Sequence, residues 1–588
     1  MINSELAKIF YRISDFLSAD RVDFKPAAYR KAALSLEDLK EDVSLIYKNR
    51  GLKAVEEIPG IGQSIGQKIE EYILNGRIGY YEELKNRLPV NWEELSGVQG
   101  IGPKRAKLLY EKLGIRNLAD LEAAARARKI SALPGFGQKS EQNIVEGVEF
   151  RKMSRGRFLL GQIQPQAEAV KIRLESLEVL ERIDIAGSLR RKKETIGDVD
   201  FLAQTTGKKN IAAVMDFFTG LPEVEKIWGK GATKSSVRMK NGFNMDLRIL
   251  PPESYGAALQ YFTGSKEHNI ALRRRAQEKG YKLSEYGLFY GDKIIAGKDE
   301  IEVYEKLGLQ WIAPELRENT GEIQAAAEGK LPDLIGYGDL KGDLHCHSNY
   351  SDGHDPIEDI AREGIGMGYG YIGIADHTKF LKVAHGLDEA AIRDRNLKID
   401  GLNAGFRSRG IDFTILKGCE ANILDDGSID IDNETLKELD FVIAGIHSNF
   451  HFDRGKMTRR IIRAMENPNV DIISHLTGRL LSGMRGSKAR EAYDLDAEKI
   501  FETSKKTGTI LEINSNSRRL DLNDGHIRRA LDYGIKMIIN TDAHYAGDLR
   551  FSELGIAQAR RGWAEKADIA NTRRLEDLKK ILKKSKIH

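Results

Sequence analysis

Seven short apolar runs between residues 340 and 545 carry side chains that can bind metal ions. They read DLHCHS, YIGIADHT, TILKGCEANI, FVIAGIHSNF, VDIISHLTG, TGTILEINSN and MIINTDAH. All but the sixth run end in His, in His beside a carboxylate, or in Glu, and ten of the twelve histidines lie between Leu344 and Tyr545. Because the carboxyl ends of parallel strands meet at one rim of a barrel, the pattern predicts a metal cluster at that rim.

Nine candidate ligands stand at the ends of six of these runs. A lone His on an apolar strand is usually a core residue, but nine such groups at matching strand ends are not explained in that way. Imidazole and carboxylate ligands favour zinc, manganese or iron over calcium, and nine ligands suit two or three ions, with Glu420 as a bridging group. Such ions lower the pKa of a bound water toward ~7, which indicates a hydrolase. The nine are His345, His347, Asp352, His377, Glu420, His447, His475, Asp542 and His544.

Three aspartates farther upstream suit a second metal site. Asp198 and Asp200 are two apart in IGDVDFLA, so they share one face of a strand, and Asp246 lies in the strand-like NMDLRIL. Upstream, AGSLRR follows a strand with a tight turn that offers backbone N–H groups, a hydroxyl and a guanidinium to phosphates. A lone D-x-D is more often a solvated strand edge. The turn and the third aspartate make two-metal phosphoryl transfer the more specific interpretation.

The first 150 residues are helical by period and repeat one pattern three times, a hydrophobe followed by two glycines two apart. The repeat resembles the helix-hairpin-helix element, whose glycines allow a tight turn and whose next helix directs backbone N–H groups to a DNA phosphate. One copy could be an ordinary interhelical turn, whereas three favour sequence-independent DNA binding. The glycines are Gly60, Gly62, Gly100, Gly102, Gly135 and Gly137.

Length and composition limit the number of domains and the class of protein. Its 588 residues predict three to five domains, and no apolar run is long enough to span a membrane. The start MINSELAKIF lacks the features of a secretion signal, and two cysteines argue against a disulfide framework, so we expect a cytoplasmic protein. Residues 151–282 hold 25 Lys and Arg against 15 Asp and Glu. That balance suits a polyanion such as DNA, although charge alone favours the interpretation as a solvated surface.

The stretch GSLRRKKETIGDVDFL resembles the nucleotidyltransferase signature of family X DNA polymerases, the group that includes DNA polymerase beta. The resemblance implies two Mg²⁺ or Mn²⁺ ions on Asp198, Asp200 and Asp246, with Asp246 also activating the primer hydroxyl. It implies that Gly187, Ser188 and Arg191 hold the incoming triphosphate. In the second motif, YFTGS, it places Tyr261 and Phe262 beside the nucleotide sugar and makes Gly264 a further nucleotide-binding residue. A core aromatic pair is the alternative for Tyr261 and Phe262. The resemblance also places Asn269 at the nascent base pair and Arg273 at the template minor groove.

The N-terminal stretch FKPAAYRKAA resembles a helix of the small lyase domain of DNA polymerase beta, and Lys68 falls where that domain carries its Schiff-base lysine. A lysine with a lowered pKa could attack an abasic sugar aldehyde. Ser64 and Tyr80 stand where that domain has further lysines. Lys68 is therefore either a lyase nucleophile or a DNA-contact residue.

The nine-ligand pattern resembles the polymerase and histidinol phosphatase (PHP) domain, a distorted seven-stranded barrel. Fused after a family X core, it resembles the bacterial and archaeal enzymes of that family. There it implies a 3′→5′ exonuclease, removal of 3′ blocks and cleavage at abasic sites, with two or three Mn²⁺ or Zn²⁺ ions.

These expectations combine into a multidomain protein with a helical helix-hairpin-helix region, an α+β nucleotidyltransferase palm and thumb, and a C-terminal distorted seven-stranded (β/α) metal barrel. The expected function is template-directed filling of short gaps in DNA repair by a monomer that binds gapped or nicked DNA, 3′ ends and dNTPs, and no membrane. The alternatives are a DNA-binding scaffold with an inert core and a small-molecule phosphoesterase. The expected boundaries are 1–88 (lyase-like), 89–150 (two further helix-hairpin-helix elements), 151–255 (palm), 256–318 (thumb), 319–338 (linker) and 339–588 (barrel).

Overall fold

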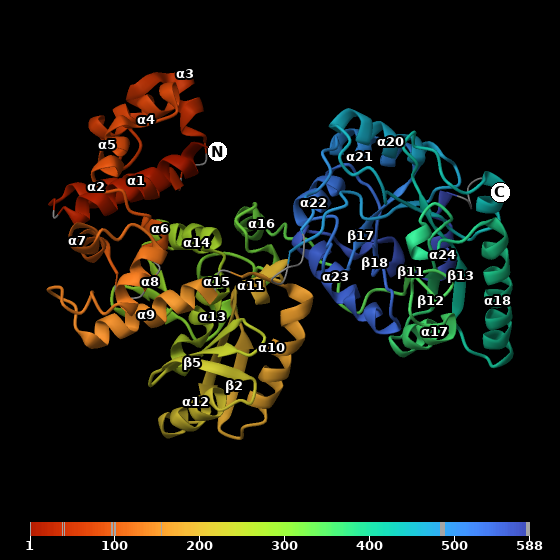
Figure 1. Ribbon diagram of the computed structural model, residues 1–588, viewed down its shortest axis with the longest axis horizontal. Coiled ribbons are helices and arrows are strands. Elements are labelled where there is room, and N and C mark those ends of the chain that lie inside the picture. Colours follow the sequence, from red (N-terminus) through yellow and green to blue (C-terminus); the bar gives the residue numbers. More distant parts are fainter. Residues whose placement is uncertain are drawn as a thin grey trace. The chain divides into compact units, whose positions relative to one another are not determined.

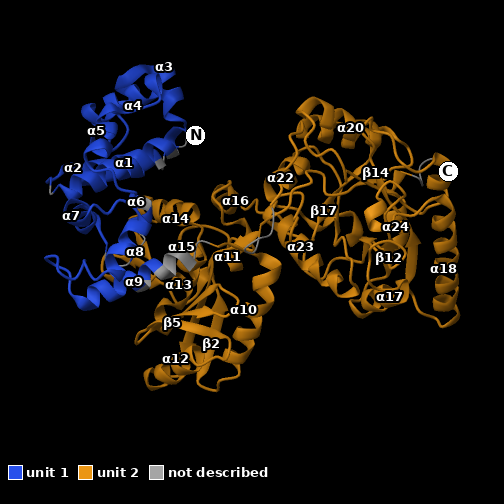
Figure 2. Cartoon of the chain, viewed as in Figure 1, with its two compact units in different colours: residues 1–155 blue, residues 156–588 orange. Residues whose placement is uncertain are grey.

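The computed structural model describes residues 2–583 apart from 21, 38, 40, 96–97, 99–100, 154–155 and 483–488. The chain forms two compact units, Met1–Arg155 and Gly156–His588, which Figure 2 colours separately. None of the described helices combines the length and apolar character needed to cross a membrane.

Unit 1 is helical, as its hydrophobic period predicts. Its helices bury a single apolar cluster that includes Phe10, Phe16 and Trp92. Gly60 and Gly135 adopt positive φ of +88° and +81°, which glycine allows without steric cost. The helices are α1 (Ile2–Ala19), α2 (Lys25–Glu37), α3 (Val43–Glu56), α4 (Gln63–Asn75), α5 (Gly79–Arg87), α6 (Trp92–Leu95), α7 (Pro103–Leu113), α8 (Leu118–Arg126) and α9 (Gln138–Met153).

The first part of unit 2 is built on a five-stranded sheet in the order β2-β4-β7-β6-β5, and β4 and β7 are its parallel pair. Side chains of β4 alternate, so Val199 and Phe201 are fully buried while the aspartates face the other side. Helices α10 and α12 contribute to the same apolar cluster as the sheet. The bounds are β1 (Phe158–Leu159), α10 (Leu160–Glu175), β2 (Leu180–Ile185), α11 (Gly187–Arg190), β3 (Thr195–Ile196), β4 (Asp198–Thr205), α12 (Ile211–Thr219), β5 (Val224–Lys230), β6 (Lys234–Met239) and β7 (Asn244–Ile249).

A smaller mixed region follows, and a buried ion network joins it to the palm. Glu300 receives hydrogen bonds from Arg190 and Arg317, at 2.8 and 2.6 Å. Residues 319–338, expected as a linker, contain a helix whose Glu322 is fully buried against His268. The bounds are α13 (Tyr255–Thr263), α14 (Lys266–Glu278), β8 (Lys282–Ser284), β9 (Gly287–Tyr290), β10 (Lys293–Ala296), α15 (Glu300–Lys306) and α16 (Glu322–Glu328).

The C-terminal region carries parallel strands in two sheets, β11-β12-β13 and β14-β15-β16-β17-β18. The run TILKGCEANI, expected as one strand, is divided into β13 and β14 at Gly418 and Cys419. A Cβ on Gly418 would lie 2.1 Å from the Phe441 ring, so only glycine fits there. Parallel bridges join His377 to Glu420, and Cys346 to Ala543 after the last strand. The strands are β11 (Gly342–Cys346), β12 (Tyr371–Ile374), β13 (Thr414–Lys417), β14 (Glu420–Asn422), β15 (Ile443–Gly445), β16 (Ile472–Ile473), β17 (Ile510–Asn514) and β18 (Met537–Asn540).

Helices follow the strands of this region, and Figure 1 labels several of them beside β11, β12 and β17. The last helix, α24, buries Leu578, and Leu582 beyond it packs in the same cluster as Leu344 and Phe441. Leu578 and Leu582 therefore belong to the interior of the region. The helices are α17 (Ile357–Gly366), α18 (Glu389–Ser408), α19 (Asn433–Lys437), α20 (Arg454–Glu466), α21 (Ala497–Thr507), α22 (Asp524–Asp532), α23 (Ser552–Arg561) and α24 (Leu575–Lys579).

Candidate active sites

The first site lies on neighbouring parallel strands of the five-stranded sheet. Asp200 on β4 stands opposite Asp246 on β7, and Asp198 precedes it by two residues on the same face. The structure therefore brings together the three aspartates that the sequence predicts as metal ligands.

The three carboxylates repel one another. Burial, followed by the charges of Asp198 and Asp246, raises the pKa of Asp200 to about 7. Burial and Asp246 also raise the pKa of Asp198. Lys234 Nζ lies 2.7 Å from Asp246 Oδ2 and compensates one of the charges. Divalent cations would relieve the remaining repulsion, so this donor set fits the metal ions that the sequence predicts.

The predicted phosphate-binding turn lies directly against these carboxylates. Gly187 begins α11 with φ +65°, and a Cβ there would lie 2.9 Å from Asp200 Oδ2. Arg191 donates from Nε to Glu318 Oε1 at 3.0 Å and from Nη1 to the Thr263 carbonyl. Ser188 is half-buried on the same turn. Arg191 thus joins the turn to the YFTGS segment.

The aromatic pair of that segment is half-buried. The rings of Tyr261 and Phe262 meet edge to face at 5.2 Å, and the Arg248 guanidinium lies 4.6 Å from the centre of the Phe262 ring. Gly264 has φ +69°, and a Cβ on it would lie 3.1 Å from Arg191 Nη1. The pair therefore lies next to β7, which carries Asp246.

The amide of Asn269 is engaged within the protein. It accepts a hydrogen bond from Gln260 Nε2 and donates one to the Tyr261 carbonyl, both at 2.7 Å. In this arrangement Asn269 positions Tyr261, and its contact with a base pair stays a prediction. Arg273 is half-buried on α14, and its contact with the template also stays a prediction.

The second site lies at the carboxyl ends of β11, β12, β15, β16 and β18, with β14 beginning at Glu420. Potential ligand atoms lie within 4.8 Å of one another in three groups, of which two share His347 and two share His377. His475 Nε2 lies 2.9 Å from Glu420 Oε1. The structure therefore brings together all nine predicted ligands. The groups are His347, Asp352, His377 and His544; His345, His347 and Asp542; and His377, Glu420 and His447.

Buried nitrogen atoms in this site lack hydrogen-bond partners within the described part of the chain. A buried polar atom without a hydrogen-bond partner lowers the free energy of unfolding. Several imidazoles that converge with free nitrogen atoms therefore fit a site for divalent metal ions. The atoms are Nε2 of His345, both nitrogens of His347, Nδ1 of His377, Nε2 of His447 and Nδ1 of His475.

The carboxylates of this site are held in their ionised form. Burial raises the pKa of Asp352, but the hydrogen bond to His544 and the charge of His347 outweigh it and lower the pKa to about 2. Burial lowers the pKa of His544, and its hydrogen bond with Asp352 and the charge of Asp542 raise it to about 9. Burial raises the pKa of Glu420, but the charges of His447 and His345 outweigh this effect and hold the pKa well below its usual range.

Two supporting residues are absent from the sequence-based prediction. Glu512, in the sixth apolar run, accepts a hydrogen bond from His345 Nδ1 at 2.7 Å and another from the backbone N–H of His475 at 2.9 Å. Asn422 Oδ1 accepts from His447 Nδ1 at 2.8 Å. Such partners fix which imidazole nitrogen faces a metal. The feature of the sequence that could have indicated Glu512 is the single carboxylate inside the apolar run ILEI.

Lys68 is half-buried on α4 in unit 1. Its Nζ donates to the Ser64 carbonyl at 3.1 Å and lies 5.2 Å from the centre of the Tyr80 ring. Burial lowers the pKa of Lys68, Glu71 opposes this and Lys25 adds to it. The lowered pKa suits a nucleophilic amine, and the exposed neighbour Ser64 suits a surface contact equally well.

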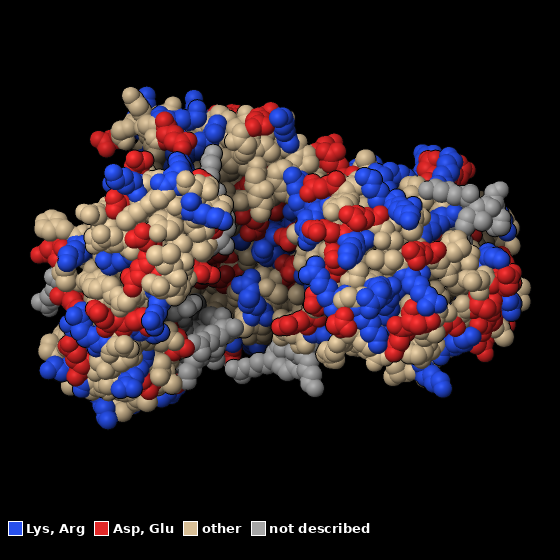
Figure 3. Space-filling view, turned by 90° about the horizontal axis from the view of Figure 1, so that it is seen from above, with Lys and Arg blue, Asp and Glu red and all other residues tan. Residues whose placement is uncertain are grey.

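The predicted DNA-binding turns precede helices in unit 1. Gly62 and Gly102 lie directly before α4 and α7, and Gly137 directly before α9. Gly100 lies outside the described residues. On the face drawn in Figure 3, basic and acidic side chains are interspersed among the coloured residues.

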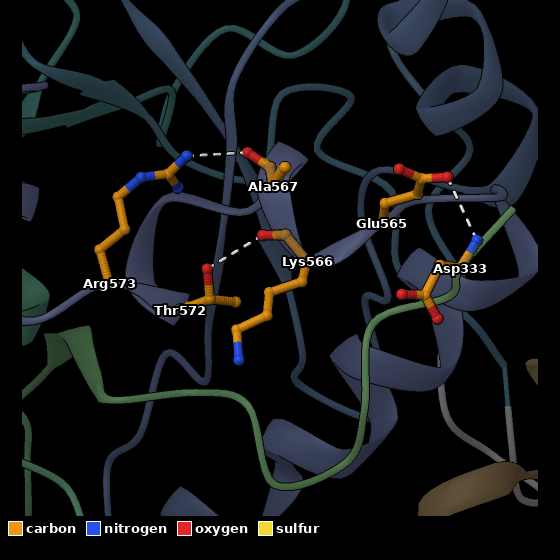
Figure 4. A pocket seen from close by; sticks show the side chains of 6 residues that line it. All are labelled: Asp333, Glu565, Lys566, Ala567, Thr572 and Arg573. Atoms are coloured by element: carbon orange, nitrogen blue, oxygen red, sulfur yellow. Dashed lines mark hydrogen bonds between the residues drawn. The ribbon is translucent and has the colours of Figure 1, made fainter.

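The pocket in Figure 4 lies apart from both clusters and has a volume of about 360 Å³. Its basic groups are engaged within the protein: Lys566 pairs with Asp339 at 2.6 Å, and Arg573 donates to the carbonyls of Ile569 and Ala567. It is not the candidate site. Its lining residues are Asp333, Glu565, Lys566, Ala567, Thr572 and Arg573.

Four segments match known families. Residues 1–78 match a helix-hairpin-helix domain, 93–149 a SAM-like helix-hairpin-helix tandem, 258–318 the DNA polymerase beta thumb and 343–516 the PHP domain. These matches confirm the predicted helix-hairpin-helix, thumb and PHP regions and their order along the chain.

Curated relatives cover the chain to different extents. The DNA polymerase/3′-5′ exonuclease PolX of Bacillus subtilis (strain 168) is 36% identical over 566 residues, 96% of each chain. DNA polymerase lambda of Arabidopsis thaliana is 24% identical over 54% of this chain and 62% of its own length. A probable phosphatase of Thermoanaerobacter sp. (strain X514) is 32% identical over 36% of this chain and 82% of its own length.

Proposed function

This chain belongs to the PolX family, and we propose that it is a DNA polymerase with a 3′→5′ exonuclease that fills short gaps during DNA repair. The observation that carries the proposal is the presence of two separate clusters of metal-ligand side chains, one on β4 and β7 and one at the ends of the C-terminal strands. The near full-length similarity to the Bacillus subtilis PolX supports both activities together.

In the polymerase site, we assign Asp198, Asp200 and Asp246 as ligands of two Mg²⁺ or Mn²⁺ ions. When bound, the ions stabilise charge on the attacking and leaving oxygens. Asp246 accepts the proton of the primer 3′ hydroxyl. The turn at Gly187 and Ser188 offers backbone N–H groups and a hydroxyl to the triphosphate, and the Arg191 guanidinium binds its negative charge. Tyr261, Phe262 and Gly264 line the space that the nucleotide sugar occupies. Asn269 contacts the nascent base pair, and Arg273 contacts the template strand. The helix-hairpin-helix turns bind backbone phosphates of the DNA.

In the C-terminal site, the nine ligands hold two or three Mn²⁺ or Zn²⁺ ions, which supply the Lewis-acid chemistry of phosphodiester hydrolysis. Glu420 contacts several of the imidazoles and bridges the ligand groups. We propose 3′-terminal nucleotides, 3′ blocking groups and abasic sites as substrates, and a cytoplasmic monomer as the working form.

The decisive experiment separates the two sites. We expect Asp198→Ala with Asp200→Ala to abolish synthesis on a gapped duplex and to leave hydrolysis intact, and His345→Ala to do the reverse. Both proteins are assayed with and without dNTPs, and circular dichroism checks folding. Loss of both activities in either folded variant would refute the assignment of two independent sites.

Lys68 is proposed as a 5′-deoxyribose phosphate lyase nucleophile because of its position on α4 and its lowered pKa. Borohydride reduction traps a Schiff base between a lysine and an abasic sugar. We expect wild-type protein to become linked to a 5′-deoxyribose phosphate end and Lys68→Ala not to do so. Equal trapping of both proteins would leave Lys68 as a DNA-contact residue.

A further inference from the structure

The C-terminal cluster is open to solvent on one side. The side chains of Asp352 and His544 are 31% and 30% exposed, whereas those of the other seven ligands are at most 11% exposed. Among the described ligands, Asp352 and His544 therefore mark the side on which a phosphodiester can reach the cluster. The residues directly beside these two ligands will meet whatever is attached to the phosphate.

Two aromatic rings occupy that position. His354 lies two residues after Asp352, and Tyr545 directly follows His544. Their rings stack at 4.1 Å between centroids with 21° between planes. Tyr545 nevertheless remains 51% exposed, and His354 is also exposed. An apolar ring face is thus available to solvent at the open side of the cluster.

The backbone holds this pair in place. The N–H of His354 donates to the His544 carbonyl at 2.8 Å, and the N–H of Ala546 donates to Asp355 Oδ2 at 2.7 Å. These bonds join the two loops on either side of the stack. The rings are therefore presented by paired loops, and little further ordering is needed when a third ring is added.

We propose that Tyr545 and His354 form a stacking surface for the terminal base of a DNA strand whose 3′ phosphodiester enters the C-terminal cluster. The proposal rests on the exonuclease function proposed above and adds a base-binding subsite to it. Aromatic side chains stack on any base, and one such contact contributes about 1–3 kcal/mol. The subsite would therefore increase affinity for a nucleotide terminus without selecting its sequence.

The test compares two single-stranded oligonucleotides that differ only at the 3′ end, where one carries thymine and the other an abasic tetrahydrofuran residue. We expect Tyr545→Ala to raise KM about tenfold for the thymine end with little change in kcat, and to leave hydrolysis of the abasic end unchanged. Tyr545→Phe keeps the ring and should behave as wild type. His354→Ala should shift KM in the same direction by a smaller factor.

Tyr286→Ala is the matched control, since Tyr286 is an exposed tyrosine (61%) in the thumb region. Metal content and the thermal midpoint are measured for each protein to detect structural damage at the ligands. An equal loss on both oligonucleotides, or no loss on either, would overturn the stacking proposal. Failure of wild-type protein to hydrolyse either oligonucleotide would instead overturn the proposed exonuclease.

Discussion

Glu512 Oε1 lies 2.7 Å from His345 Nδ1, so a fully buried carboxylate orients the first imidazole of the C-terminal cluster. The hydrogen bond leaves His345 Nε2 directed to the ligand carboxylates, 3.4 Å from Glu420 Oε2 and 3.6 Å from Asp542 Oδ1. A carboxylate in this position fixes the tautomer of a metal-binding His and raises its basicity.

Glu512→Gln keeps the shape of that side chain and removes its charge. We expect metal affinity of the C-terminal site to fall about 10–100-fold, as measured by calorimetric titration of Mn²⁺, because His345 becomes a weaker ligand. Exonuclease activity at limiting Mn²⁺ should fall in parallel, and primer extension should not change. Glu438→Gln, in an exposed pair with Arg393, is the matched control. Unaltered Mn²⁺ affinity in Glu512→Gln would contradict the role given to this residue.

Gly187 is a position where an added methyl group should reduce polymerase activity more than it reduces the stability of the fold. Its φ of +65° disfavours other residues, and a Cβ would approach Asp200 Oδ2 to 2.9 Å. Displacement of a ligand carboxylate by a fraction of an ångström disturbs the reacting geometry, so Gly187→Ala should lower kcat/KM for dNTP insertion by about 100-fold. Gly207→Ala, at a palm glycine with open space around it, should retain normal insertion. Insertion by Gly187→Ala at the wild-type rate would show that this approach is unimportant.

The C-terminal region also contacts the turn at residues 187–191 that we propose to bind phosphate. Arg561 on α23 donates from Nη1 to the Arg191 carbonyl and to Glu318 Oε1, each at 3.1 Å, and it pairs with Asp524. Glu318 Oε1 therefore accepts hydrogen bonds from both Arg191 and Arg561. We expect the second guanidinium to weaken the pairing of Glu318 with Arg191, so that Arg191 can bind a triphosphate.

Arg561→Gln should raise KM for dNTP about tenfold with a smaller effect on kcat, measured on a gapped duplex. The reason is that Glu318 then binds Arg191 alone. Addition of Glu318→Gln to this variant should restore much of the affinity. The matched control is Arg560→Gln on the same helix, which loses its pair with Glu315 but has no contact with Arg191. A double variant as impaired as Arg561→Gln would exclude competition for Arg191.

We expect the stability of the palm and thumb to depend on pH through His268. It is fully buried between Glu322 on α16 and Tyr304 on α15, with Arg317 and Glu300 nearby. Burial lowers its pKa below 6.5 and outweighs the opposing hydrogen bond to Glu322. The unfolded chain consequently takes up the proton first as pH falls. The contribution of His268 is complete above about pH 6.5 and is lost as pH falls through its folded pKa.

Thermal unfolding between pH 7.5 and 5.5 checks this sign. The midpoint of wild-type protein should fall more steeply below pH 6.5 than that of His268→Gln, which cannot take up the proton. The two midpoints should therefore converge on acidification. Parallel curves for the two proteins would show that His268 does not titrate during unfolding.

Both ligand clusters could be predicted because the signals are local. Residues two apart on a strand share a face, as Asp198 and Asp200 do, and parallel strands end at one rim, where His447 and His475 lie. The repeated glycine pairs of unit 1 are local in the same sense. Each of these signals occupies a few consecutive residues, and no knowledge of distant contacts is needed to recognise it.

The supporting contacts could not be predicted in this way. Glu512 lies 167 residues from His345, and Arg561 lies 370 residues from Arg191. Nothing in the residues around either partner indicates the pairing, because it depends on how the strands and helices pack. The helix α16 was missed for a related reason. Its sequence is rich in small residues, and it is held by the pairing of Glu322 with His268.

The order in which the interior of the C-terminal region is assembled has a consequence for biosynthesis. Leu578 and Leu582 pack beneath the strands, and the N–H of Lys583 donates to the buried Asp471 at 2.8 Å. All nine ligands are translated before these residues, so a nascent chain carries the whole nuclease donor set while its supporting layer is still missing. Folding generally proceeds from the N-terminal side during synthesis, so hydrolysis by this site should appear only after Leu578 and Leu582 have left the ribosome and packed against the strands.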